Sequence, residues 1–330
     1  MSEIVVSSRV RLARNYEDLP FRNRISPEQG EECVQRTLNA LRDLPEAYTF
    51  LPLRGMKETE RRALVEAHLI SPDLLGHEDR GAVLIRQDEK ISVMMNEEDH
   101  LRIQAFAPGD QLGEAAENAF CIEDALQRRL SFAFDSQLGY LTACPTNTGT
   151  GMRASVMLHL PMLTLLKQMG KVNQLAAKLG LTIRGIYGEG SEALGNLYQL
   201  SNQVTLGRTE GEILEAVTAV ARQMAGMEEV FREKTWEKDS LAFEDQLYRS
   251  YGLAAYARRM TIKEFMVHWS NLRLGAAMKK LPLTVETCDA LLTAAQPAHV
   301  QQAAGEGLGP KELDEKRGEI VRRAVNGGMN

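Results

Sequence analysis

The chain has 330 residues, 44% hydrophobic and 25% charged, enough for one large soluble domain or two smaller ones. A net charge of −6 and an isoelectric point near 5.7 argue against a general nucleic-acid-binding protein, which usually carries a basic excess. No apolar run approaches the roughly 18 residues of a membrane-spanning helix, and no signal peptide is evident. Four widely spaced cysteines without a CxxC pair favour a reduced, cytoplasmic protein.

Strand and helix patterns alternate up to about residue 230. β-Branched residues flanked by Gly or Pro predict extended segments over residues 4–8, 82–86, 91–95, 140–143, 181–187 and 203–206. Capping-box residues predict helix starts at Ser26, Thr209 and Thr261. Gly180 is expected to end a helix over residues 173–179.

Beyond about residue 232 the strand patterns fade. Apolar residues three and four apart predict helices over residues 241–259, 262–280 and 285–295. We therefore expect a mixed α/β domain over residues 1–232 and a smaller all-helical domain over residues 233–330, with the boundary placed to within about ten residues. The helical domain could pack on the first domain or pair with a second copy of itself.

The segment ISVMMNEEDHLRIQ, residues 91–104, places five polar residues directly after a short apolar strand. These side chains could be solvated charges at a strand end. A metal site is disfavoured, because consecutive strand residues point to opposite faces and no HExxH spacing is present. Carboxylates at this strand end could instead hold a cationic substrate.

The segment CPTNTGTGMRAS, residues 144–155, leads from small residues into a helical pattern expected to begin near Ala154. It contains a GxGxxA match, but without an early βαβ unit or an acidic residue about 20 positions later we reject a dinucleotide site. A loop at a helix start could still bind an anion. The chain has neither a P-loop nor the HRD and DFG motifs of eukaryotic-type kinases.

Two further segments allow a plain and a functional interpretation. In RGIYGEGS, residues 184–191, Glu189 stands between glycines, in a simple turn or in a mobile loop that delivers a carboxylate on closing. In SSRVRLARN, residues 7–15, a strand would project Arg9 and Arg11 to one face. Taken alone, that pattern is more often a solvated edge.

Together, and in this order, the four segments resemble the signature blocks of the phosphagen (guanidino) kinases. The resemblance extends through VEAHLISPDLL, LYQLSNQVTLG and the tail segment EDQLYRSYG, covers nearly the whole chain, and is strongest to the bacterial branch that phosphorylates protein arginine. It implies an α+β fold, in which a mainly antiparallel sheet flanked by helices forms the catalytic domain and a small all-helical domain follows.

The resemblance implies transfer of the γ-phosphoryl group of ATP to a guanidinium nitrogen. Arginine offers a permanently charged, planar fork for phosphate oxygens. The resemblance places Arg9, Arg11, Arg102, Arg153 and Arg184 around the phosphates. It adds as nucleotide contacts Ser7, Ser8, Val10, His68, Ala154, Ser155, Val156, Met157, Gly185, Ile186, Tyr187, Gly188 and Glu189. Mg²⁺ is expected to be held mainly by phosphates and water, so no dedicated metal ligands are predicted.

A protonated guanidinium is a poor nucleophile and needs a proton acceptor and a fixed orientation. The motif match implies that Glu98 and Glu189 clamp it, with Glu98 as general base and Glu189 on a closing loop. Cys144 matches the family's reactive cysteine, whose thiolate nearby arginines would favour, although it could merely pack. The neighbours of Glu98 within NEEDH are expected to hold it in place. Cys33, Cys121 and Cys288 are expected to be core thiols.

Kinases of free arginine and creatine carry a helical domain ahead of the first signature block, which here begins at residue 7. We therefore expect an open site for arginine residues of other proteins, with a small guanidino compound as the alternative substrate. The resemblance further implies a homodimer, a zinc-finger activator protein, marking of substrates for ClpC–ClpP and inactivation of a heat-shock repressor. No direct nucleic-acid or membrane partner is expected.

The tail departs from the RDxxRA motif that binds phosphoarginine in this branch. Asp314 and Arg317 remain, but Leu313 and Gly318 replace the first arginine and the alanine. Loss of a bidentate anion fork predicts a reduced or absent allosteric response to phosphoarginine. A catalytically idle adaptor is a second alternative, which the complete catalytic set disfavours.

Overall fold

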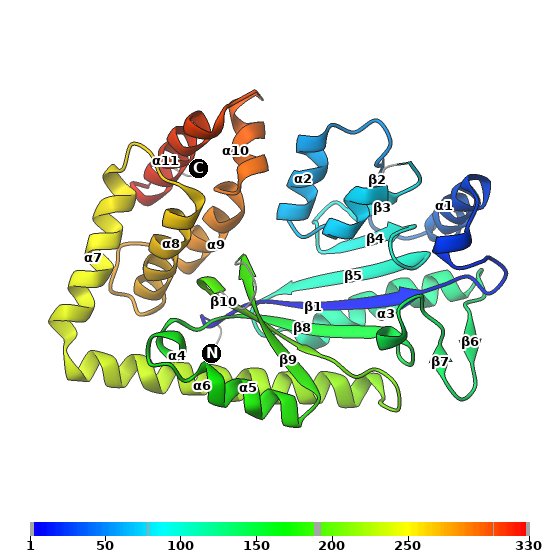
Figure 1. Cartoon of the computed structure of the whole chain (residues 1–330), viewed down its shortest axis with the longest axis horizontal. Coiled ribbons are helices and arrows are strands. Elements are labelled where there is room, and N and C mark those ends of the chain that lie inside the picture. Colours follow the sequence, from blue (N-terminus) through cyan, green and yellow to red (C-terminus); the bar gives the residue numbers. More distant parts are fainter. Residues whose placement is uncertain (1–2, 78, 188–192, 306, 328–330) are drawn as a thin grey trace.

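The computed structural model describes residues 3–77, 79–187, 193–305 and 307–327. Its centre is an eight-stranded sheet in which every neighbouring pair is antiparallel (Figure 1). The spatial order is β2 (Tyr48–Pro52), β3 (Ala82–Arg86), β4 (Ile91–Met95), β5 (Leu101–Pro108), β1 (Val5–Arg14), β8 (Met152–His159), β10 (Ala193–Asn202) and β9 (Leu181–Tyr187). A short separate ribbon pairs β6 (Phe134–Asp135) with β7 (Gly139–Tyr140).

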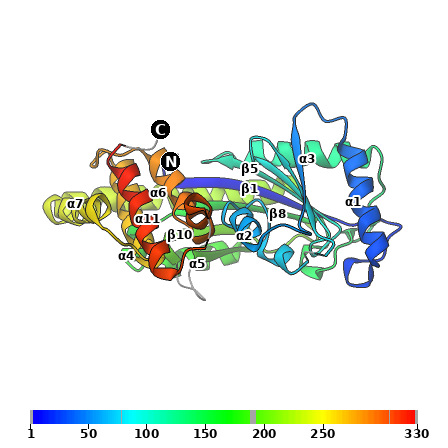
Figure 2. The same ribbon diagram turned by 90° about the horizontal axis from the view of Figure 1, so that it is seen from above.

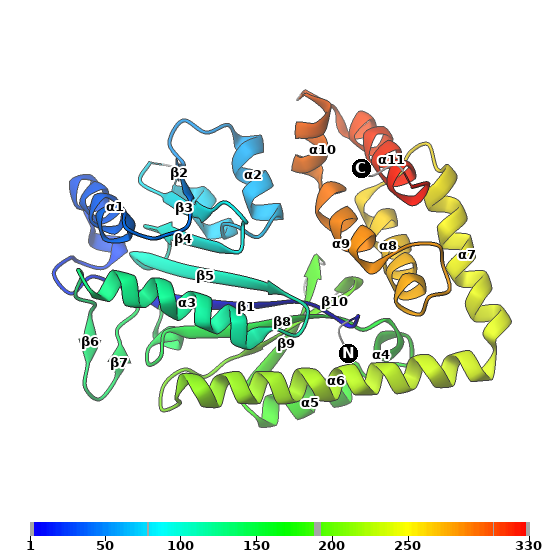
Figure 3. The same cartoon turned by 180° about the vertical axis from the view of Figure 1, so that it is seen from behind.

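Helices cover one face of this sheet and leave much of the other face for the site described below. Figure 3 shows α3 (Leu112–Gln127) and the long α6 (Glu210–Lys238) running along the covered face. The main core lies between these helices and the strands, and a second, smaller core lies beside η2 (Pro72–His77). The remaining elements of this part are α1 (Pro27–Leu41), α2 (Glu58–Glu66), α4 (Pro161–Leu165), α5 (Met169–Lys178), η1 (Arg22–Arg24) and η3 (Pro145–Asn147).

The C-terminal helices form a bundle with its own core at one end of the sheet (Figure 2). They are α7 (Ser240–Tyr256), α8 (Ile262–Ala277), α9 (Val285–Ala294), α10 (Pro297–Ala304) and α11 (Pro310–Val325). Helix α8 packs on β10, and α10 returns to contact α2. At that contact the Glu66 carboxylate accepts hydrogen bonds from the backbone N–H of Ala298 and of His299, at 2.8 and 3.0 Å. None of the helices in the described part of the chain is long and apolar enough to span a bilayer.

Local signals in the sequence predicted many elements correctly. Ser26 and Thr209 each form the expected capping box, and Thr261 caps α8. The strand predictions over residues 82–86, 91–95 and 181–187 match β3, β4 and β9. The α+β architecture, an antiparallel sheet flanked by helices and followed by a helical region, is confirmed. Residue 232 lies inside the continuous helix α6, so the division of the chain there stays a prediction.

Four sequence predictions were wrong in whole or in part. No helix begins near Ala154; residues 152–159 form β8, because cavity-facing and buried side chains alternate there with the period of a strand. Residues 203–206 are irregular, and within 140–143 only Tyr140 is in a strand. Cys121 is exposed on α3 rather than a core thiol, whereas Cys33 and Cys288 are buried.

Candidate active site

Five predicted phosphate-binding arginines project from one face of the sheet. On β1, Arg11 lies opposite Arg153 of β8 and opposite Gln104 of β5. Two positions further along β1, Ala13 lies opposite Arg102. Directly opposed residues in an antiparallel pair share a face, so segments about 140 residues apart in the chain deliver their arginines to one surface. On β9, Arg184 joins this face through its partner Gln199 of β10.

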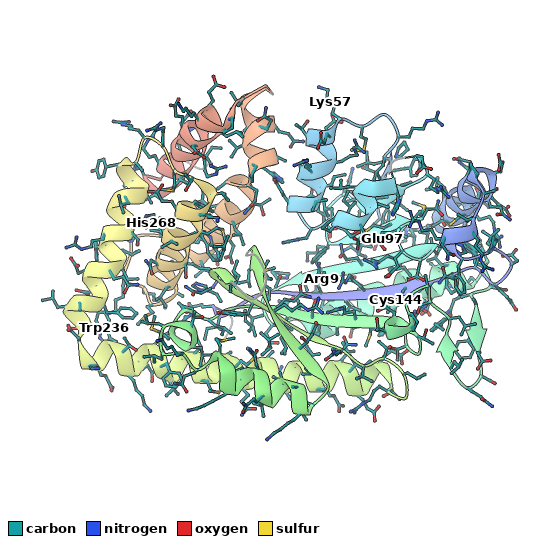
Figure 4. The ribbon with its side chains drawn as sticks, viewed as in Figure 1. Arg9, Lys57, Glu97, Cys144, Trp236 and His268 are labelled. Carbon is teal, nitrogen blue, oxygen red and sulfur yellow. The ribbon has the colours of Figure 1, made fainter. Side chains whose placement is uncertain are left out.

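These arginines line a cavity of about 390 Å³, which also receives the acidic end of β4 and the segment after β7. Figure 4 shows Arg9 and Cys144 along the same side of the central strands, with Glu97 above them. The cavity is lined by Arg9, Arg11, Ala13, Asp73, Glu98, Arg102, Cys144, Thr146, Asn147, Gly151, Arg153, Arg184, Gln199 and Ser201. The cavity thus brings together the five predicted arginines, Glu98 and Cys144.

The arginine cluster is short of negative charge. Burial, and then the charges of Arg9, Arg102 and Arg153, lower the pKa of Arg11 well below its ordinary value. Burial lowers the pKa of Arg153 as well, with Arg184 and Arg102 adding to the effect. The Nε atoms of Arg11 and Arg153 are buried and have no hydrogen-bond partner. Buried donors without acceptors cost free energy, and the oxygens of a polyanion would satisfy them.

Glu98 lies in the turn after β4, in the acidic part of the cavity lining and beside Arg102. Its side chain is 40% exposed, and Oε2 lies 3.1 Å from Nη2 of Arg102 and 3.5 Å from Nδ2 of Asn147. Partial burial raises the pKa of Glu98 above its ordinary value, against the opposing charge of Arg102, and neighbouring carboxylates raise it further. A carboxylate that is partly desolvated and loosely paired is suited to accept a proton.

The residues beside Glu98 hold it in place, as expected from the sequence. Glu97 is fully buried, accepts a 2.6 Å hydrogen bond from the Glu98 N–H and pairs with Nη1 of Arg102 at 2.7 Å. Asp99 accepts hydrogen bonds from Asn15 Nδ2 and from the Ala143 N–H, both at 2.7 Å. Asp99 therefore ties the turn of Glu98 to the segment that carries the cysteine.

The two other NEEDH residues also serve this turn. Asn96 has the positive φ of 57° that starts it and donates hydrogen bonds to the carbonyls of Gly30 and Arg80. His100 accepts a 3.0 Å hydrogen bond from the Tyr16 N–H at Nδ1. The polar run is thus mostly scaffold, and Glu98 is the member that faces the cavity.

Cys144 sits at the start of η3, with Sγ 3.0 Å from Oγ1 of Thr146. The loop after it is pinned by Thr205, whose hydroxyl donates to the carbonyls of Thr146 and Thr148. Gly149 has a φ of +117°, and a Cβ there would lie 2.5 Å from the Thr205 carbonyl oxygen. Gly149 therefore serves a tight turn against Thr205.

Other predicted nucleotide contacts lie around the cavity or behind it. Val10, Ala154 and Val156 are fully buried in the main core, on the helix-covered side. The Ser8 hydroxyl donates to the Gly109 carbonyl, and Ser155 Oγ lies 3.5 Å from Nε of Arg9. The remaining predicted positions, Ser7, Met157, Gly185, Ile186 and Tyr187, lie on β1, β8 and β9 beside the cavity.

His68 follows α2 with a left-handed φ of 60°, and its carbonyl accepts a hydrogen bond from Gln104. Burial, followed by the charge of Arg9, lowers the pKa of His68 to about 4, so the ring is neutral near pH 7. Gly188 and Glu189 lie outside the described residues. The predicted role of Glu189 therefore stays a prediction.

Several cavity residues were not predicted. Gln199 Oε1 accepts from Nη2 of Arg9 at 3.1 Å, and Ser201 Oγ accepts from Nη2 of Arg153 at 3.1 Å. Both stand at alternating positions of the segment LYQLSN, and that period of two was the available signal. Asp73 and Asn147 lie inside segments that were noted for other residues.

In the tail, the two residues predicted as an allosteric pair, Asp314 and Arg317, bond to each other within the helical bundle. Arg317 is 2% exposed and donates to the carbonyls of Ala295 and Met260 and to the Asp314 carboxylate. A Cβ on Gly318 would lie 3.0 Å from the Arg258 carbonyl oxygen, so the helix packs closely there. These contacts give both remaining motif residues a structural function.

Residues 29–231 match the profile of the ATP:guanido phosphotransferase C-terminal catalytic domain, and residues 240–328 match that of the protein-arginine kinase McsB C-terminal domain. The protein-arginine kinase of Caldanaerobacter subterraneus is 42% identical over 98% of this chain and 97% of its own length. The enzymes named protein-arginine kinase from Brevibacillus brevis and Symbiobacterium thermophilum are 44% and 45% identical over 98% of this chain and over 92% and 94% of their own lengths. The chain belongs to the protein-arginine kinase family.

Solved structures of guanidino kinases share the fold of this protein-arginine kinase family member. Lombricine kinase aligns over 71% of this chain and 68% of its own, with a TM-score of 0.62 at 23% identity. The duplicated taurocyamine kinase of Schistosoma mansoni, with bound transition-state analogue components, aligns over 77% of this chain and 39% of its own, with a TM-score of 0.62 at 27% identity. The chain is thus a kinase enzyme of the guanidino phosphotransferase type.

Proposed function

We propose that this enzyme transfers the γ-phosphoryl group of ATP to the guanidinium group of arginine residues in proteins. The observation that carries the proposal is a single cavity lined by five arginines and also by Glu98 and Cys144. The arginines suit a polyphosphate, and Glu98 with Cys144 suits a cationic acceptor. The names of the full-length relatives favour protein arginine over a free guanidino compound as the acceptor.

The arginines bind and orient the triphosphate. Arg11 and Arg153 carry the buried Nε donors that lack partners, and these donors fit phosphate oxygens. Bound Mg²⁺ would neutralise part of the developing charge, held mainly by phosphates and water. Among the described residues, no group of three or more His, Cys, Asp or Glu side chains is placed to bind a metal ion.

Glu98 acts on the acceptor. A bond forms between a guanidinium nitrogen and the γ-phosphorus while the bond from that phosphorus to the bridging oxygen breaks, and ADP leaves. The proton of the attacking nitrogen passes to the Glu98 carboxylate. Cys144 contacts the guanidinium beside Glu98, and we propose Glu189 as the second carboxylate of the clamp. Fixing these groups in line supplies much of the rate enhancement, since the chemistry asks for positioning.

We also propose the finer biological setting from the family resemblance. Phosphorylation of arginine would mark proteins for ClpC–ClpP and inactivate a heat-shock repressor, and a zinc-finger protein would activate the enzyme. The free cysteines of the enzyme fit a cytoplasmic location. A homodimer is supported by the exposed apolar side chains of Leu241 and Tyr256 on α7, 76% and 78% exposed. We propose a weak response to phosphoarginine, because Leu313 replaces an arginine and Arg317 is bonded within the bundle.

The decisive experiment incubates the protein with MgATP and an arginine-containing basic protein, followed by mass spectrometry under non-acidic conditions, because the P–N bond is labile to acid. Phosphoarginine in the protein acceptor is the expected result. Free arginine serves as the competing acceptor in a parallel reaction. Transfer to free arginine with none to the protein would refute the proposal in favour of a small-molecule phosphagen kinase.

A further inference from the structure

One carboxylate of the cavity has no role in the mechanism above. Asp73 belongs to η2, the 3₁₀ segment that follows Ser71, and it lines the cavity together with Glu98 and Cys144. Its residue is exposed, so its carboxylate stands at the open side of the cavity.

The position of Asp73 is fixed by the same buried glutamate that fixes Glu98. The Ser71 hydroxyl donates a hydrogen bond to Glu97 Oε1 and accepts one from the Leu74 N–H at 3.2 Å. Glu97 also accepts the hydrogen bond of the Glu98 N–H. The two segments that carry Asp73 and Glu98 are thus both hydrogen-bonded to the buried Glu97 carboxylate.

Asp73 is not neutralised by the protein. Within the described part of the chain its carboxylate forms no hydrogen bond or ion pair, although five arginines line the same cavity. Its charge nonetheless reaches Glu98, where it helps to disfavour ionisation. Two negative charges that face one space repel, and a cation bound there relieves the repulsion.

We propose that Asp73 is a specificity-determining residue that draws the acceptor guanidinium into the acidic end of the cavity and holds it beside Glu98. This inference rests on the proposed function and names a residue of its acceptor site. Asp73 binds the acceptor in the ground state, whereas Glu98 acts in the transfer step. The charge of Asp73 also repels polyphosphate, so it helps to give the two substrates opposite ends of the cavity.

The test compares Asp73→Asn, Asp73→Glu and the wild-type enzyme with an unstructured arginine-containing peptide and MgATP. The matched control is Asp79→Asn, which changes another exposed aspartate after η2 that pairs with Arg80 and does not line the cavity. Loss of one solvent-exposed ionic contact predicts that Asp73→Asn raises the peptide KM roughly two- to fivefold. The KM for ATP and kcat should change less than about twofold by the same reasoning, and Asp73→Glu should restore most of the peptide affinity.

A second readout separates recognition from damage to the fold. The peptide KM of the wild type should rise with salt more steeply than that of Asp73→Asn, because one screened charge has been removed. If Asp73→Asn behaves like Asp79→Asn, or alters the KM for ATP as much as that for the peptide, this inference is wrong although the kinase proposal stands. If the wild-type enzyme phosphorylates no arginine residue, the proposed function and this inference fail together.

Discussion

Two glutamate–arginine pairs in this molecule have the same spacing of four residues but differ in burial and in hydrogen bonding. Glu98 pairs with Arg102 at 3.1 Å, and its side chain is 40% exposed at the cavity. Glu228 pairs with Arg232 at 2.9 Å within α6 and is fully buried against the start of α4. The oxygens of Glu228 also accept hydrogen bonds from the N–H groups of Met162 and Leu163, at 2.9 to 3.1 Å.

The difference lies in how completely each charge is satisfied. The Glu228 carboxylate is fully enclosed by protein donors, so its removal would leave Arg232 with a buried, unpaired charge. Glu98 retains free capacity for a ligand, and its pKa is raised by partial burial and by nearby carboxylates. The same pair of residue types is therefore structural where its hydrogen bonds are complete and available for chemistry where they are not.

Glu98→Gln should produce the largest effect on catalysis and almost none on stability. The amide keeps the shape but cannot take a proton, so turnover should fall about 10²- to 10⁴-fold. Because the pKa of Glu98 is raised in the fold, ionisation of Glu98 disfavours folding, and removing the charge should not lower the free energy of unfolding. Steady-state kinetics and urea unfolding measure the two quantities. Retained turnover would show that Glu98 is not the base.

Glu228→Gln should show the reverse pattern. Arg232 would keep a buried charge without its partner, which is expected to lower the free energy of unfolding by about 3–5 kcal/mol. The turnover of the folded fraction should stay near that of the wild type, since Glu228 does not line the cavity. Urea unfolding and kinetics well below the melting temperature provide the comparison. A stable but inactive variant would contradict the structural role.

Arg11→Met tests whether the cavity arginines favour ATP binding at the expense of the stability of the fold. Loss of one charge-assisted contact should weaken ATP binding tenfold or more. The free energy of unfolding should not fall, because repulsion from Arg9, Arg102 and Arg153 is relieved. Calorimetry with nucleotide and urea unfolding check these outcomes. Arg62→Met, which removes an exposed arginine of α2 paired with Glu58, is the control and should leave ATP affinity unchanged. A large loss of stability in Arg11→Met would show that Arg11 stabilises the fold.

The smallest expected effect is a shift in pH dependence. Glu98 must be deprotonated to act, and its pKa lies above the ordinary 4.5, so kcat/KM should fall as the pH drops through that raised value. Asp73, Glu97 and Asp99 raise this pKa and Arg102 lowers it. Removing one negative charge in Asp73→Asn should therefore move the acidic limb to lower pH. An ADP-release assay avoids the acid-labile product. An unmoved limb would show that Asp73 does not affect the ionisation of Glu98.

Much of the local structure was readable from the sequence because its causes are local. The capping boxes at Ser26 and Thr209 involve residues three apart, and a short apolar run predicted β4. Strand β8 was mistaken for a helix because its Ala, Met and Leu content favours helices. The alternation of Arg153 and Ser155 with Ala154 and Val156 was the better guide.

The sequence alone determined the chemical inventory: the arginines, the carboxylate run and the glycine-bearing turn, whose order in the chain indicated the family. Tertiary structure decided which of these groups meet. Antiparallel register brings Arg11 opposite Arg153 and so builds a cluster of mutually repelling cations. It also decided that Glu97 is a buried support and Glu98 the exposed carboxylate, although the two are adjacent and chemically identical. Burial and charge balance depend on neighbours distant in the chain, and they separate a structural residue from a reactive one.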